Sequence, residues 1–122
     1  MASILLVDDT PELRKTIERL LTGAGHAVTS AENGAAALRE LDRATFDVIV
    51  TDIVMPDMEG LELIRKVRKT HASLPIIAMS GGGRGSTEDY LALAANFGAA
   101  KTLEKPFALE ALKAAIDEVL RA

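Results

Sequence analysis

The chain has 122 residues, enough for one globular domain with a single hydrophobic core. It contains no cysteine, which excludes disulfides, zinc thiolates and thiol redox chemistry, and its net charge of −4 with a pI near 5.2 argues against binding of nucleic acid or an anionic membrane. Because no apolar run reaches the length of a signal peptide or a transmembrane helix, we expect one cytoplasmic domain over residues 1–122.

Short apolar runs alternate with helical patterns along the whole chain. Hydrophobic residues make up 48% of it and aromatic residues only 3%, so the core is expected to be aliphatic. The apolar runs that predict strands cover residues 4–7, 27–30, 46–51, 74–79 and 101–103. The patterns that predict helices cover residues 11–22, 34–43, 61–69, 87–97 and 109–120. This alternation predicts an α/β domain in which helices cover both faces of a parallel sheet.

The predicted helices carry start signals and distinct faces. Thr10 is expected to cap the first helix, with Pro11 at its first helical position. The third helix is expected to turn Leu61, Ile64 and Val67 toward the core. We interpret its basic run, residues 65–69, as a solvated face, because the chain as a whole is acidic.

Reactive polar residues follow the apolar runs of four different strands. In chain order they are Asp8, Asp9, Asp52, Ser80 and Lys105. Because the carboxyl ends of parallel strands meet at one edge of a sheet, and ligands bind there, we expect these side chains to converge on one site. Three carboxylates, a hydroxyl and an ammonium group together predict a site for a divalent cation and a phosphoryl group.

Each of these residues also has a purely structural interpretation. An aspartate after a strand is often a helix cap or a turn residue, and a serine before glycines is often only a loop residue. The pair Asp8-Asp9, however, precedes Thr10-Pro11, which already supply a helix start. Mg²⁺ prefers one or two carboxylates together with water and phosphate, which favours the metal interpretation. A carboxylate such as that of Asp52 can also act as a nucleophile and form an acyl phosphate.

These motifs, taken together, resemble those of a known family. The matching pieces are the acidic pair Asp8-Asp9, the loop Asp52-x-x-Met-Pro-x-Met-x-Gly, the hydroxyl of Ser80 and the triplet Lys105-Pro106-Phe107. In this order and spacing, the chain resembles the receiver (CheY-like) domain of two-component response regulators over essentially its whole length. The resemblance implies a five-stranded parallel sheet of order 2-1-3-4-5, doubly wound with helices on both faces (flavodoxin-like).

The resemblance also implies a magnesium site. Asp9 and Asp52 would bind Mg²⁺ directly, Asp8 would bind it mainly through water, and the backbone carbonyl of Val54 would complete the protein ligands. Mg²⁺ is therefore the cofactor that we expect from the family.

The resemblance assigns the phosphoryl chemistry to three residues. Asp52 would accept a phosphoryl group from the phosphohistidine of a sensor histidine kinase or a histidine phosphotransfer protein. Lys105 would pair with the phosphate, and Ser80 would be the hydroxyl that moves toward it. Such a domain is not an enzyme in the ordinary sense, because it catalyses only its own phosphorylation and dephosphorylation.

The output implied by the resemblance is a contact with another protein. Phosphorylation would switch a surface that binds a downstream protein target, with no contact to nucleic acid or membrane. The face formed by the fourth helix, fifth strand and fifth helix often carries partner or dimer contacts in the family, which leaves a homodimer open. The chain departs from the family at Thr102, where receivers commonly carry an aromatic residue.

Two other functions fit the sequence less well. A phosphatase of the haloacid-dehalogenase type also uses a strand-end aspartate and Mg²⁺, but it needs a second aspartate where this chain has Val54. A nucleotide-binding loop could be sought in residues 81–86, but they lack the Lys-Ser/Thr ending of a Walker loop and the third glycine of a dinucleotide fingerprint.

Overall fold

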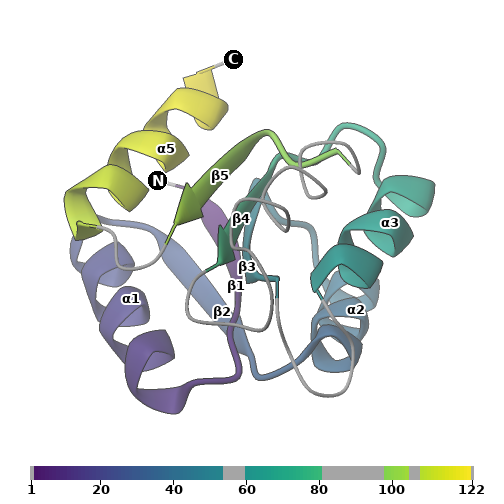
Figure 1. Cartoon of the computed structure of the whole chain (residues 1–122), viewed down its shortest axis with the longest axis horizontal. Coiled ribbons are helices and arrows are strands. Elements are labelled where there is room, and N and C mark those ends of the chain that lie inside the picture. Colours follow the sequence, from purple (N-terminus) through teal and green to yellow (C-terminus); the bar gives the residue numbers. More distant parts are fainter. Residues whose placement is uncertain (1, 54–59, 81–97, 105–107, 122) are drawn as a thin grey trace.

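The structure is a computed structural model, and it describes residues 2–53, 60–80, 98–104 and 108–121 (Figure 1). The strands are β1 (Ser3–Val7), β2 (Ala27–Ala31), β3 (Val48–Asp52), β4 (Ile76–Ser80) and β5 (Lys101–Glu104). The helices in the described part are α1 (Pro11–Gly23), α2 (Gly34–Arg43), α3 (Gly60–Thr70) and α5 (Leu109–Arg121). The helix expected at residues 87–97 lies outside the described residues.

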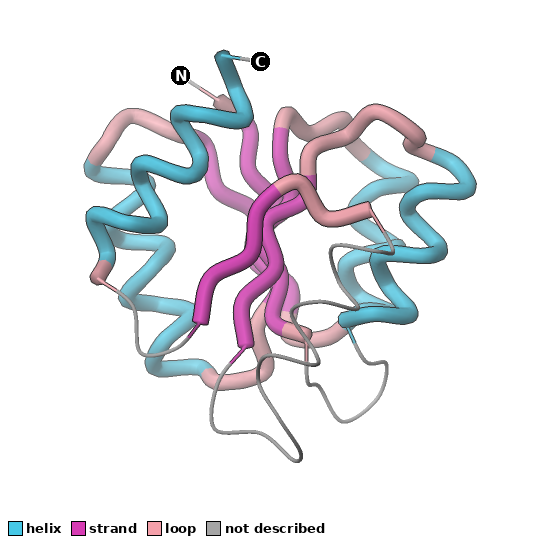
Figure 2. The backbone as a smooth tube through the Cα atoms, turned by 45° about the horizontal axis from the view of Figure 1, so that its top comes forward, coloured by secondary structure: helices cyan, strands magenta, loops and turns pink. Residues whose placement is uncertain are grey.

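The strands form one five-stranded sheet in the order β2-β1-β3-β4-β5, and every neighbouring pair is parallel (Figure 2). The expected α/β fold class and strand order are confirmed. Because β1 is flanked by β2 on one side and β3 on the other, the direction of winding reverses there. The carboxyl ends of β1 and β3 therefore border the crevice in which doubly wound sheets bind their ligands.

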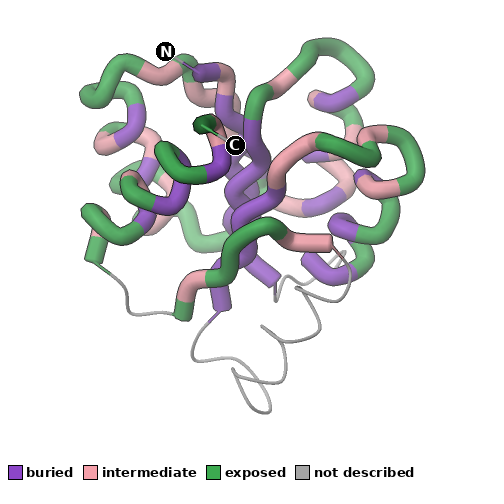
Figure 3. The backbone as a smooth tube through the Cα atoms, turned by 90° about the horizontal axis from the view of Figure 1, so that it is seen from above, coloured by how far each residue is buried: buried purple, intermediate pink, exposed green. Residues whose placement is uncertain are grey.

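The core has two halves, one on each face of the sheet, because successive strand residues point to opposite faces. The half that includes α1 and α5 contains Ile4, Leu6, Ile17, Leu21, Val48, Val50, Ile77, Met79, Leu112 and Ile116. The half that includes α2 and α3 contains Leu5, Val7, Leu41, Ile49, Leu61, Ile64, Val67, Ile76 and Ala78. Figure 3 shows the buried strands at the centre and the exposed outer turns of the helices around them. Nearly continuous apolar runs are what a sheet covered on both faces requires.

Most predicted boundaries lie within two residues of the observed ones. The strand predicted from Phe46 begins at Val48. Just before it, the Asp47 amide donates to the Ser3 carbonyl at 2.7 Å, and the Asp47 carboxylate accepts from the Ser3 amide at 2.7 Å. The strand predicted from Leu74 begins at Ile76. No helix in the described part of the chain combines the length and apolar character that a bilayer span requires.

The basic run of α3 is not wholly solvated, so its interpretation as a solvated face is wrong at Arg68. The guanidinium of Arg68 is partly buried and donates to the Gly98 carbonyl through Nε at 3.2 Å and Nη2 at 2.8 Å. Its Nη1 donates to the His71 carbonyl at 3.0 Å. Burial lowers the pKa of Arg68 from its usual value. The side chain therefore ties the end of α3 to the segment that leads into β5.

Removing this guanidinium is expected to destabilise the fold. Arg68→Met keeps the apolar stem but loses three hydrogen bonds from a charged donor, which we expect to lower the free energy of unfolding by about 2 kcal/mol. Lys69→Met is the matched control, since Lys69 is exposed on the same helix and carries the same charge. We expect that control to change stability by no more than about 0.5 kcal/mol in urea unfolding. Equal losses in the two variants would contradict a role for the Arg68 bonds.

The strand β5 is one of the two edge strands of the sheet and is largely exposed. Lys101 Nζ lies 2.5 Å from Glu118 Oε2 on α5, and this contact lowers the pKa of Glu118. Both side chains are about half exposed, so the pair contributes little to stability. Thr102, at the position where the resemblance leads us to expect an aromatic residue, is exposed on this strand.

Candidate functional site

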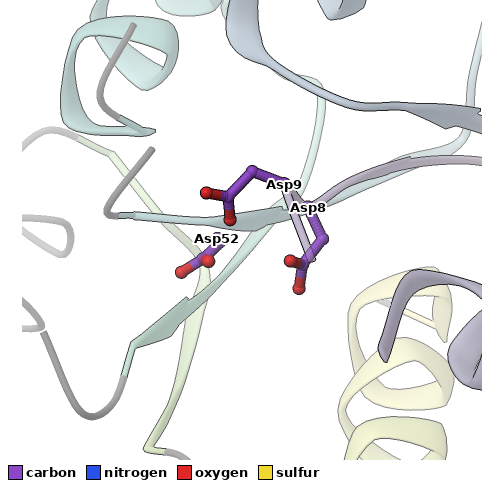
Figure 4. A group of neighbouring side chains, drawn as sticks. All are labelled: Asp8, Asp9 and Asp52. Carbon is purple, nitrogen blue, oxygen red and sulfur yellow. The ribbon is translucent and has the colours of Figure 1, made fainter. Parts of the chain in front are cut away.

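Three carboxylates meet at the carboxyl ends of β1 and β3 (Figure 4). Asp8 and Asp9 follow β1 directly, and Asp52 is the last residue of β3. One carboxylate oxygen from each residue lies within 4.8 Å of the other two. Asp8 and Asp52 are buried, with 0% and 7% of their surface exposed, while Asp9 is exposed. The structure thus brings together the three acids that strand-end positions led us to expect.

The Asp8 end of this site is held by backbone contacts. The Asp8 amide donates to the Ala31 carbonyl of β2 at 3.2 Å, and its Oδ1 accepts from the Thr10 amide at 2.8 Å. Thr10 occupies the expected cap position of α1 with extended backbone angles, but its own side chain makes no capping bond. The cap of the turn is therefore the carboxylate of Asp8, which joins the acidic pair to the start of α1.

The Asp52 end is held by the start of α3. The Ile53 amide donates to the Met79 carbonyl at 2.9 Å, and the Gly60 amide donates to the Ile53 carbonyl at 2.5 Å. A methyl group on Gly60 would lie 2.5 Å from the Ile53 Cα and would overlap the Asp52 carbonyl oxygen. Glycine is required here because the first turn of α3 presses directly on the backbone that carries Asp52.

Ser80 contributes a buried hydroxyl at the end of β4. The residue is 1% exposed, and its Oγ has no hydrogen-bond partner among the described residues. Leaving a buried hydroxyl without a hydrogen bond costs roughly 1–3 kcal/mol, so such groups are rare in native proteins and often have a functional role. Ser80 pairs in register with Glu104 of β5, the residue just before Lys105. Lys105 and Val54, both predicted site residues, lie outside the described residues.

The donor set suits a hard divalent cation. All three groups are carboxylates, and carboxylate oxygens are the ligands that Mg²⁺ and Ca²⁺ prefer. Three negative groups at this distance also repel one another, and a bound cation relieves that repulsion. The arrangement can therefore hold a metal ion beside the carboxylate of Asp52.

The sequence reasoning assigned no role to Arg14, although this residue contacts the site. Arg14 Nη1 donates to the Asp8 carbonyl oxygen at 2.8 Å. No local motif signals this contact, because the five residues between donor and acceptor include both a turn and the start of a helix. Helical spacing relates Arg14 to Thr10 but says nothing of a side chain that reaches back beyond the helix start.

Comparison with known proteins gives a consistent picture. The family model described as the response regulator receiver domain matches residues 4–117. The transcriptional regulatory protein GlrR of Escherichia coli (strain K12) is 38% identical over 119 residues, which cover 98% of this chain and 26% of GlrR. The sensor kinase CckA of Brucella abortus (strain 2308) is 36% identical over 121 residues, 98% of this chain and 12% of CckA. The chain thus spans about a quarter or less of the length of these relatives.

The solved structures agree with the sequence comparison. The crystal structure of a response regulator receiver domain protein from Clostridium thermocellum superposes with a TM-score of 0.91 at 29% identity, covering 99% of this chain and 95% of that one. The match therefore extends over both the sheet and the strand ends that carry the three acids. With the family model matching nearly the whole sequence, the chain belongs to the family of response regulator receiver domains.

Proposed function

We propose that this receiver domain accepts a phosphoryl group on Asp52 from a phosphohistidine, in a reaction that depends on Mg²⁺. The observation that carries the proposal is the convergence of three carboxylate oxygens within 4.8 Å at the carboxyl ends of β1 and β3. Membership of the receiver family supports the same chemistry. The acceptor is assigned to Asp52 because it ends the central strand β3 and matches the family motif that runs on to Gly60.

The metal site in this proposal uses the acidic cluster. Asp9 and Asp52 would bind Mg²⁺ directly, Asp8 would bind it mainly through water, and the Val54 carbonyl would complete the protein ligands. The bound ion would supply positive charge that neutralises the oxygens of the phosphoryl group during transfer. The assignment is supported by the three carboxylate oxygens, one from each aspartate, that lie within 4.8 Å of one another.

In the transfer itself, the protein mainly positions the reacting groups and stabilises their charge. A carboxylate oxygen of Asp52 attacks phosphorus, the bond between phosphorus and the histidine nitrogen breaks, and an acyl phosphate forms. The histidine ring keeps the electron pair of that bond and leaves as neutral imidazole, with its one ring proton supplied by solvent. Lys105 pairs with the transferred phosphate. The buried hydroxyl of Ser80 donates a hydrogen bond to a phosphate oxygen. The phosphate is then the hydrogen-bond partner that this hydroxyl lacks among the described residues.

The biological role in this proposal is signal relay. The phosphoryl donor is a sensor histidine kinase or a histidine phosphotransfer protein, and phosphorylation switches a surface that binds a downstream protein in the cytoplasm. Residues 1–122 act as one receiver domain, which catalyses only its own phosphorylation and dephosphorylation. A homodimer through the face of the fourth helix, β5 and α5 is the alternative output, and neither output involves nucleic acid or membrane.

The proposal is tested by intact mass after incubation with acetyl phosphate. We expect one phosphoryl adduct on the wild-type protein with Mg²⁺ and none after removal of the metal with a chelator, because transfer needs the cation. Phosphorylated histidine kinases serve as a second donor for the same protein. A wild-type protein that takes no phosphoryl group from either donor would overturn the proposed function.

Mg²⁺ is also expected to stabilise the folded protein. At a concentration 100 times its dissociation constant, the ion should raise the free energy of unfolding by about 2.7 kcal/mol, because it binds the folded cluster and not the unfolded chain. Asp9→Asn should remove most of this gain and leave the metal-free protein at least as stable as wild type. Asp117→Asn, at an exposed aspartate of α5, should respond to Mg²⁺ like wild type. Thermal unfolding with and without Mg²⁺ measures this stabilisation in the wild type and in both variants. If Mg²⁺ stabilises Asp9→Asn as much as wild type, Asp9 is not a ligand of the site.

A further inference from the structure

We propose that Arg14 is a positioning residue for the metal site, acting through the backbone carbonyl of Asp8. The inference rests on the proposed function, because it concerns how the acidic pair is presented to Mg²⁺. Arg14 lies in the second turn of α1, is partly buried, and donates from Nη1 to the Asp8 carbonyl oxygen at 2.8 Å. A bond from a charged donor at this distance is among the stronger hydrogen bonds in proteins.

The contact belongs to a set of three that brace the short connection between β1 and α1. The Asp8 carboxylate accepts from the Thr10 amide at 2.8 Å, and the Thr10 carbonyl accepts from the Arg14 amide at 2.9 Å. The Arg14 side chain then returns to the Asp8 carbonyl. Arg14 thus contacts the connection from both its backbone and its side chain, and Asp9 lies between the braced positions.

Asp9 is the residue that needs this brace. It is exposed, and no described residue donates a hydrogen bond to its carboxylate, whereas the buried Asp8 carboxylate is held by Thr10. Figure 4 shows the Asp9 and Asp52 side chains next to each other, and a carboxylate oxygen of Asp9 lies within 4.8 Å of one of Asp52. The direction of the Asp9 side chain therefore depends on its backbone, and the peptide that joins Asp8 to Asp9 is the one whose carbonyl Arg14 holds.

Two roles for Arg14 predict opposite effects on metal binding. If its positive charge mattered only as a charge near three carboxylates, it would compete with the cation, and removing it would tighten Mg²⁺ binding. If its hydrogen bond orients the Asp8-Asp9 peptide, removing it would weaken Mg²⁺ binding, because the ligands must be ordered when the ion binds. The short bond to the carbonyl, made by a partly buried side chain, favours positioning.

The test compares Arg14→Met and Arg14→Lys with the same substitutions at Arg19, an exposed residue of the same helix that loses the same charge. Mg²⁺ affinity is measured by isothermal titration calorimetry. We expect Arg14→Met to bind Mg²⁺ about tenfold more weakly than Arg19→Met, and Arg14→Lys to lie between Arg14→Met and wild type. In the metal-free proteins, amide hydrogen exchange at Asp9 and Thr10 should be faster in the Arg14 variants, with the core amides of β1 unchanged.

A kinetic readout separates positioning from general damage. With acetyl phosphate as donor, Arg14→Met should need about tenfold more Mg²⁺ for half-maximal phosphorylation, while its rate at saturating Mg²⁺ stays within about twofold of wild type. If Arg14→Met does not fold, the comparison of Arg14→Lys with Arg19→Lys decides. Arg14 variants that bind Mg²⁺ as well as the Arg19 variants, or more tightly, would overturn the inference. A wild-type protein that binds no Mg²⁺ would instead overturn the proposed function.

Discussion

Replacing Asp52 with asparagine is expected to abolish uptake of a phosphoryl group. The amide differs from the carboxylate by one heteroatom, so the fold around the buried side chain should persist, but the amide lacks the nucleophilic oxygen that forms the acyl phosphate. We expect phosphorylation by acetyl phosphate to fall by about two orders of magnitude or more. Intact mass after incubation with acetyl phosphate and Mg²⁺ measures this loss directly.

The control for this experiment is an aspartate outside the site. Asp117→Asn changes the net charge by the same amount at an exposed position of α5, and it should be phosphorylated like wild type. Circular dichroism checks that the Asp52→Asn protein is folded. If Asp52→Asn gains an adduct as fast as wild type, the acceptor is another residue, and peptide mapping of that adduct would identify it.

Replacing Gly60 with alanine is expected to destabilise the protein, although alanine is the better helix former by about 1 kcal/mol. The added methyl would lie 2.5 Å from the Ile53 Cα and 3.0 Å from the Asp52 carbonyl carbon, so α3 must move away from the end of β3. Forcing atoms into a packed site typically costs about 1–3 kcal/mol, occasionally more, and the neighbouring atoms here are backbone. We expect a net loss of about 2 kcal/mol in the free energy of unfolding, together with slower phosphorylation, because the moved backbone carries Asp52.

Gly23→Ala is the matched control for Gly60→Ala. Gly23 is the last residue of α1, and a methyl group there would meet no atom within 4 Å. Helix propensity should then act without overlap and stabilise the protein by up to about 1 kcal/mol. Urea unfolding of the two variants should therefore give changes of opposite sign. A stabilised Gly60→Ala protein would show that the contact between α3 and the end of β3 relaxes at little cost.

The sequence by itself determined the fold class and the location of the acidic cluster. Apolar runs separated by helical patterns are a local property of the chain, and parallel strands align their carboxyl ends whatever their order. The position of Asp8 and Asp52 directly after such runs was therefore enough to bring them to one edge. The strand order came from resemblance to the family and not from the runs, because hydrophobic alternation does not specify which strands are neighbours.

The tertiary structure decided the contacts between segments that lie far apart or that turn back on themselves. Arg68 looked like part of a solvated face, but its guanidinium reaches the Gly98 carbonyl, thirty residues away. Gly60 belonged to the motif that begins at Asp52, but the motif does not explain why glycine is needed. The structure shows that a side chain at Gly60 would overlap the backbone at the end of β3. Arg14 carried no signal at all, and only the folded turn places its side chain on the Asp8 carbonyl. Residue type and period predict whether a side chain faces the core or solvent, whereas a hydrogen-bond partner depends on distances that exist only once the strands and helices have packed.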